Sequence, residues 1–139
     1  MDKQERRQAH FNKAYLGVIA QGEPATAYSP HTSSGLRCVY LADNGSKCAV
    51  GHLLSEEELQ KYGDVLGGVD DLWDGMYLRE DADHDHPFYE DARFYDAMQN
   101  KHDNLMGYSG TEFVEAFKQE MASFARFYNL TVPDETATA

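Results

Sequence analysis

The sequence predicts an α+β fold, a mostly helical single domain in which one β-hairpin packs against about four helices. Stretches with apolar residues at helical spacing predict the helices. The stretch CVYLADNGSKCAVGHLLSEEE, residues 38–58, predicts the hairpin, because Asn44-Gly45 between two apolar runs is typical of a type I′ turn. A chain of 139 residues has the length of one domain; we expect residues 1–131 to form it and residues 132–139 to be a flexible tail.

The first helix is predicted over about residues 3–20. Asp2 and Glu5 have the spacing of a capping box, and Gly22 and Pro24 end the helix. Its apolar residues fall on one stripe: Phe11, Ala14, Tyr15, Val18 and Ile19. Residues 23–36 lack periodicity and are predicted to form a loop.

The register of the hairpin decides whether its two cysteines meet. A two-residue loop pairs Leu41 with Cys48 and turns Cys38 to the opposite face, whereas a three-residue loop would bring both cysteines to one face. After the hairpin, Ser55 and Glu58 again have capping-box spacing, which predicts a helix over residues 56–62.

The second half of the chain is predicted to be helical on both sides of an acidic stretch. Residues 63–78 are expected to form short helical turns around Trp73, and residues 88–105 a helix that follows Pro87. The last helix begins at Ser109 or Thr111. Its aromatic stripe is expected to be its main packing surface: Phe113, Phe117, Met121, Phe124 and Tyr128.

Net charge is the strongest global feature of the sequence. Twenty-four Asp and Glu residues against twelve Lys and Arg residues give a net charge of −12. Such a chain repels nucleic acid directly and is attracted to basic proteins. Nine carboxylates are expected to form the partner-binding surface: Glu56, Glu57, Glu58, Asp70, Asp71, Asp74, Asp81, Asp83 and Asp85.

The alternating aspartates of the acidic stretch also have the spacing of a calcium loop. Counted from Asp81, however, the sixth and twelfth places hold His86 and Ala92, where an EF-hand requires Gly and Glu. We therefore exclude an EF-hand and expect a solvated acidic loop.

Neither a membrane span nor a secretory signal is predicted. No apolar run approaches the ~20 residues needed to cross a bilayer, and the N-terminal MDKQERRQAHF is polar. We expect a cytoplasmic protein without a membrane partner.

Two short patterns carry a resemblance to a known family. They are the Cys-x-Tyr and Cys-Ala-x-Gly-x-Leu pairing of the hairpin and a later Gln-x-x-His-Asp, which fall here on Cys38, Tyr40, Cys48, Ala49, Gly51, Leu53, Gln99, His102 and Asp103. With the segments around them, over residues 11–130, they resemble a family of small uncharacterised proteins common in phage and prophage genomes. The loop before Cys38 and the acidic residues 81–86 depart from the family pattern. The resemblance implies a fold and a phage-like setting in the host cytoplasm, but no reaction.

Both cysteines belong to a candidate metal site. Two thiolates and two imidazoles suit tetrahedral zinc, and the sequence offers one such set: Cys38, Cys48, His52 and His102. The nine-residue gap between the cysteines is not a zinc-knuckle spacing, and the two-residue hairpin register separates their side chains. We therefore expect two buried, reduced cysteines and no cofactor, with zinc as the alternative.

A cysteine enzyme is the second alternative, with Cys48 as nucleophile, His102 as base and Asp103 as the group that orients the base. Adjacent helical residues point about 100° apart, so Asp103 is not expected to hold His102. We assign no catalytic residue and expect His102 to be a hydrogen-bonded interior histidine.

These observations favour an acidic phage-type interaction protein, more an inhibitor than an enzyme. Its expected partner is a basic host protein, such as one that handles nucleic acid. A zinc-stabilised structural or regulatory module and a Cys48-dependent enzyme are the alternatives.

Overall fold

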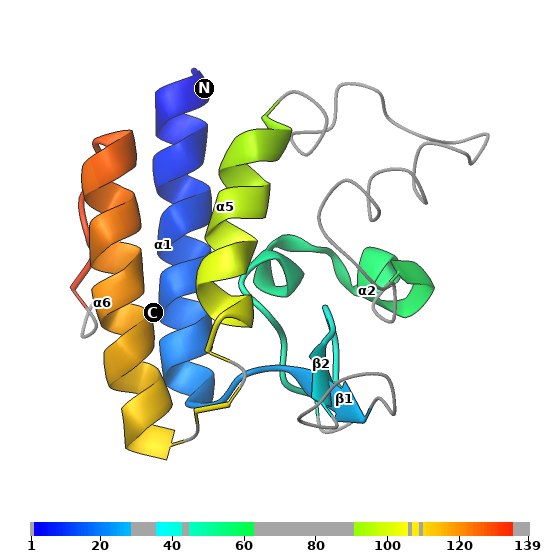
Figure 1. The fold of residues 1–139 in the computed structure, drawn as a ribbon. Coiled ribbons are helices and arrows are strands. Elements are labelled where there is room, and N and C mark those ends of the chain that lie inside the picture. Colours follow the sequence, from blue (N-terminus) through cyan, green and yellow to red (C-terminus); the bar gives the residue numbers. More distant parts are fainter. Residues whose placement is uncertain are drawn as a thin grey trace.

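The computed structural model describes residues 2–28, 36–42, 45–62, 91–105, 107–108 and 110–134. The elements in these ranges are α1 (Lys3–Gln21), β1 (Thr26–Tyr28), β2 (Leu36–Cys38), the 3₁₀ helix η1 (Val50–Leu53), α2 (Glu56–Tyr62), α5 (Ala92–Asp103) and α6 (Gly110–Tyr128). Figure 1 shows α1, α5 and α6 as a bundle in which α6 runs opposite to the other two helices. Within the described ranges, no helix is long and apolar enough to cross a membrane.

Among the described residues the predicted hairpin is not formed, and the α+β fold class is therefore wrong. Leu41 and Lys47 form only an isolated antiparallel bridge, and the chain turns into η1 three residues later. The strand content of the described residues is a pair of three-residue strands, β1 and β2, in which Thr26 is the partner of Cys38. The structure is mostly helical, and β1 lies where a loop was predicted.

Side chains replace a strand partner in the segment after Lys47. The backbone N–H of Val50 donates to Gln99 Oε1 of α5 at 2.9 Å, and the N–H of Gly51 donates to the sulfur of Cys48 at 3.2 Å. Buried N–H groups need an acceptor, and here they find it in side chains. Because the N–H groups of Val50 and Gly51 already have acceptors, this segment does not need a neighbouring strand and can form the 3₁₀ helix η1. η1 packs against α1 and α5.

The caps of α1 and α2 follow their sequence signals. Asp2 Oδ1 accepts from the backbone N–H of Glu5 at 2.8 Å, and α1 ends at Gly22, whose φ of 80° favours glycine. Ser55 and Glu58 form a reciprocal capping box, at 2.9 and 3.1 Å. The predicted helices over residues 3–20 and 56–62 are confirmed within one residue.

Aromatic packing between α1 and α6 forms the centre of the core. Phe11 stacks on Phe124 with ring centroids 5.9 Å apart, and Tyr15 stacks on Phe117 at 6.3 Å. The predicted aromatic stripe of α6 is confirmed, since all but the half-buried Tyr128 are buried: Phe113, Phe117, Met121 and Phe124. Each such pair contributes about 1 kcal/mol beyond the burial of its area. The predicted turns around Trp73 and the acidic residues 81–86 lie outside the described residues.

A buried ion pair joins α1 to the start of α5. Arg7 donates from Nε and Nη2 to the two carboxylate oxygens of Asp91, both at 2.8 Å, and the Asp91 side chain is only 4% exposed. The guanidinium also lies 5.1 Å from the ring centres of Phe94 and Tyr128. The pair is bidentate and shielded from water, which makes its loss costly.

Replacing Arg7 with alanine should lower the free energy of unfolding by about 2 kcal/mol, because the buried Asp91 carboxylate loses its bidentate partner and keeps only the exposed Lys3, whose Nζ lies 3.8 Å away. Urea denaturation followed by circular dichroism measures the change. Arg126→Ala, at an exposed position of α6, is the control and should stay within about 0.5 kcal/mol of the parent. Equal stability of the two variants would contradict this account.

Candidate functional site

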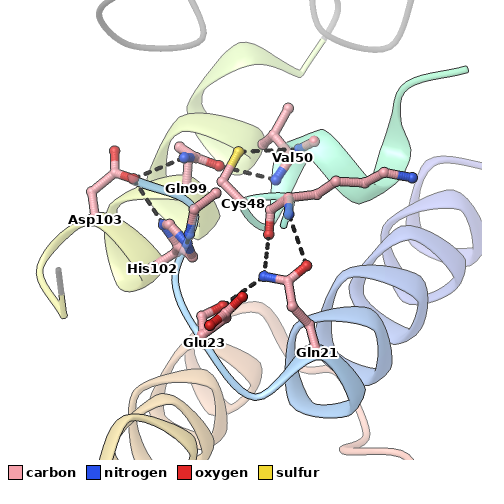
Figure 2. A network of polar contacts seen from close by, with 10 residues as sticks. Gln21, Glu23, Cys48, Val50, Gln99, His102 and Asp103 are labelled. Atoms are coloured by element: carbon pink, nitrogen blue, oxygen red, sulfur yellow. Dashed lines mark hydrogen bonds and ion pairs between the residues drawn. The ribbon is translucent and has the colours of Figure 1, made fainter. Parts of the chain in front are cut away.

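Three polar residues share one side of α5, two of them buried and the third, Asp103, partly exposed. Gln99, His102 and Asp103 are spaced i, i+3 and i+4, so they lie on the same side of the helix. Figure 2 shows Gln99 reaching toward Cys48 and Val50, while Asp103 lies beside both Gln99 and His102. We call Gln99, His102, Asp103 and Cys48 the α5 polar cluster. It contains all three residues of the cysteine-enzyme alternative: Cys48, His102 and Asp103.

Gln99 connects the α5 polar cluster to η1. It is 3% exposed, and its Oε1 accepts from the N–H of Val50. Its Nε2 donates to Asp103 Oδ1 at 2.8 Å (Figure 2). Both ends of the amide are thus used, and one of its partners is backbone from a segment 49 residues away. The sequence analysis noted Gln99 only within a family pattern and gave it no role.

His102 is held from both ring nitrogens. Its side chain is fully buried, and Nε2 accepts from the backbone N–H of Ala25 at 3.1 Å. Nε2 therefore carries no proton, and Nδ1 is the donor toward Asp103 Oδ1 at 3.1 Å. The predicted interior histidine is confirmed. The expectation that Asp103 cannot hold His102 is wrong, because the flexible Asp103 side chain reaches the adjacent ring at the end of α5.

Cys48 is a buried thiol and a poor nucleophile. Its side chain is fully buried, and burial raises its pKa to about 12, against the opposing effect of the Gly51 N–H bond. A thiol with this pKa stays protonated at neutral pH, whereas nucleophilic attack requires the thiolate. The His102–Asp103 pair therefore lies beside a thiol that stays protonated.

Gly51 explains the Cys-Ala-x-Gly pattern. A Cβ at this position would lie 2.2 Å from the carbonyl oxygen of Tyr40 and 3.3 Å from Cys48 Sγ. Only glycine lets the backbone of η1 approach the Tyr40 carbonyl this closely. The pattern therefore specifies a close backbone contact and a sulfur acceptor.

His52 packs on α1 in the space left by a second glycine. A Cβ on Gly17 would lie 2.6 Å from His52 Nδ1, so the imidazole lies directly against the helix backbone. Burial, with a smaller contribution from the positive charges of Lys47 and Lys13, lowers the pKa of His52 to about 4. Its Nε2 is buried and has no hydrogen-bond partner among the described residues. The ring is therefore neutral at neutral pH.

The predicted zinc ligands do not converge in the described part of the chain. Cys48 Sγ is held by Gly51, and both nitrogens of His102 are used by Ala25 and Asp103. Among the described residues, no three His, Cys, Asp or Glu side chains are placed to hold a metal ion. The structure describes the backbone of Cys38, which lies in β2, but not its side chain. A zinc site that includes Cys38 stays an untested prediction.

The structure describes only part of the predicted acidic surface. Glu56 and Glu57 are exposed in the first turn of α2, where Glu57 also pairs with Lys61 at 2.9 Å. Glu58 is half-buried and serves as the capping partner of Ser55. The other six predicted carboxylates lie outside the described residues: Asp70, Asp71, Asp74, Asp81, Asp83 and Asp85.

Sequence reasoning missed the role of Gln21. Its Oε1 accepts from the N–H of Lys47 at 2.7 Å, and its Nε2 donates to the carbonyl oxygens of Lys47 and Glu23 at 2.9 and 2.6 Å (Figure 2). The amide therefore pairs with the Lys47 backbone much as a strand neighbour would. A glutamine one residue before the helix-ending glycine carried no signal for this contact.

Comparisons with protein-family models, curated proteins and solved structures find no match to this chain. The resemblance to a phage and prophage family stays a prediction. The functional argument therefore depends on the geometry and charge of the chain itself.

Replacing Gly51 with alanine should lower the free energy of unfolding by about 2 kcal/mol, because the new Cβ collides with the Tyr40 carbonyl. Gly107→Ala is the matched control, since its Cβ would meet no atom within 4 Å. Thermal and urea unfolding of both variants measure the difference. If G51A is as stable as G107A, the close approach at Gly51 is not a constraint.

Acid should destabilise the fold through His52. Its pKa is about 4 in the folded protein against an ordinary value of 6.5, so between these values the unfolded chain binds more protons. Stability is therefore complete above pH 6.5 and falls as the pH drops toward 4. Since solvent screens a half-buried ring, we expect a loss of about 2 kcal/mol over this window, less than the full shift would give.

His52→Gln removes the titrating group and serves as the comparison for this pH dependence. The difference in unfolding free energy between parent and variant, measured in urea from pH 7 to pH 4, isolates His52 from the carboxylates. The parent should lose more stability than H52Q. Parallel curves would show that His52 titrates alike in the folded and unfolded chains.

Proposed function

We propose that this chain is an interaction protein that binds a basic partner through an acidic surface that includes the start of α2. The observation that carries the proposal is the net charge of −12, from 24 carboxylates against 12 Lys and Arg residues. A surface of one sign raises the association rate with partners of the opposite sign and sets the orientation in which they meet.

The position of α2 supports this proposal. Figure 1 shows α2 on the side of the fold opposite α6. Leu59 anchors the helix in the core at 4% exposure, while Glu56 and Glu57 remain exposed at its first turn. Acidic residues in the first turn also stabilise the helix, so these glutamates have a local role beside the proposed one.

The state of the α5 polar cluster also favours binding over catalysis. Its thiol is protonated, its imidazole is engaged at both nitrogens, and its amide is engaged at both ends. These side chains satisfy buried backbone donors, and that leaves the charged exterior as the part of the molecule that meets a partner.

The partner class follows from the same electrostatics. A protein that handles nucleic acid presents a basic cleft to phosphates, and a dense carboxylate surface competes for such a cleft. Occupation of the cleft would inhibit the partner. In a phage-like setting the partner would be a host protein.

Replacing Glu56 and Glu57 together with glutamine should weaken capture of the partner severalfold at low ionic strength. Immobilised protein is exposed to a bacterial lysate, and bound proteins are eluted by a salt gradient. Screening by salt should release a partner held by charge. Glu112→Gln with Glu115→Gln removes the same charge from the first turns of α6 and is the matched control. The proposal would be contradicted if the double variant of Glu56 and Glu57 captured as much partner as the parent, or if salt did not release the partner.

A further inference from the structure

A hollow between α5 and α6 differs in character from the rest of this acidic molecule. We call it the α5–α6 hollow; its volume is about 450 Å³. Its lining includes Arg93, Ala97 and Lys101 from α5 and three aromatic residues from α6, and no carboxylate. In a chain with twice as many acidic as basic residues, such a lining stands apart.

The α6 side of the hollow is aromatic. Phe124 is almost fully buried, whereas Phe127 is 82% exposed, by far the most exposed of the large apolar side chains in the described residues. Tyr128 packs against Phe127 with ring centroids 5.0 Å apart. Tyr128 in turn packs against Phe124 at 4.8 Å, so the exposed Phe127 ring continues into the buried aromatic surface beneath the hollow.

The α5 side of the hollow is cationic. Arg93, Ala97 and Lys101 are spaced i, i+4 and i+8, which places the two charges about 12 Å apart along one side of the helix. Lys101 pairs with Glu120 at 3.1 Å. Arg93 is exposed and forms no ion pair with another residue of the described part. Arg93 is therefore the charge available to a ligand.

We propose that the α5–α6 hollow binds an acidic peptide segment of a partner protein. An aromatic side chain of the segment packs against Phe127 and Tyr128, and a neighbouring carboxylate pairs with Arg93. A guanidinium binds a carboxylate through two parallel hydrogen bonds. Aromatic pairs contribute binding free energy beyond that of the apolar area they bury. An extended segment of about four residues spans the distance from Arg93 to Lys101.

The salt dependence of this interaction should be the reverse of that at the α2 surface. The net charge of −12 repels an acidic peptide at long range, and 0.15 M salt limits this repulsion to about 8 Å. The contact with Arg93 is shorter than that and persists. Binding should therefore strengthen from low to physiological ionic strength. This second site is independent of the proposed binding of a basic partner.

The test uses two fluorescein-labelled peptides, the acidic GEEFDDLG and its basic counterpart GKKFKKLG, in anisotropy titrations with the full chain. The acidic peptide should bind more tightly at 0.15 M than at 0.01 M salt. Arg93→Glu and Phe127→Ala should each weaken its binding at least fivefold. Arg126→Glu makes the same charge change at an exposed α6 residue outside the lining and should preserve binding within twofold.

Any of three results with the acidic peptide would overturn the proposal. These are no binding of the acidic peptide at millimolar protein, equal loss in R93E and R126E, or binding that is unchanged in F127A. Binding of the basic peptide alone, strongest at low salt, would also reject it while leaving the acidic surface intact as a site. Arg93 and Phe127 are both exposed, and circular dichroism of each variant confirms that the fold is retained.

Discussion

The fold depends on the need of buried backbone N–H groups for acceptors. Ala25 and Val50 belong to two connecting segments that pack against α5, and their N–H groups have no strand or helix partner. His102 and Gln99 supply the acceptors, at 3.1 and 2.9 Å. An unsatisfied buried donor costs about 1–3 kcal/mol, so two polar side chains of one helix determine where both connections lie.

The same contacts explain why cysteine, histidine and aspartate side chains that lie together need not form a catalytic or metal site. A cysteine, a histidine and an aspartate lie together in this protein, yet each satisfies a structural requirement. Burial keeps the Cys48 thiol protonated, the backbone N–H of Ala25 donates to His102 Nε2, and Asp103 Oδ1 accepts from both His102 and Gln99. The residues form a satisfied polar network, and such networks fix one packing arrangement.

The exterior carries two surfaces of opposite character. The start of α2 is acidic in keeping with the whole chain, whereas the hollow between α5 and α6 is aromatic and cationic. Figure 1 shows that α2 and α6 are on opposite sides of the fold. In the two proposals, the long-range field of the chain attracts a basic partner, whereas a short-range contact at Arg93 binds an acidic peptide.

The sequence by itself determined the local features of this protein. The Asp2 cap of α1, the capping box of Ser55, the glycine end of α1 and the aromatic stripe of α6 all follow from residues near one another in the sequence. The tertiary structure alone decided that residues 48–53 coil into η1 instead of forming a strand after Asn44-Gly45. The deciding hydrogen bonds join Val50 to Gln99 and Ala25 to His102 across 49 and 77 residues, and local patterns carry no record of partners so distant.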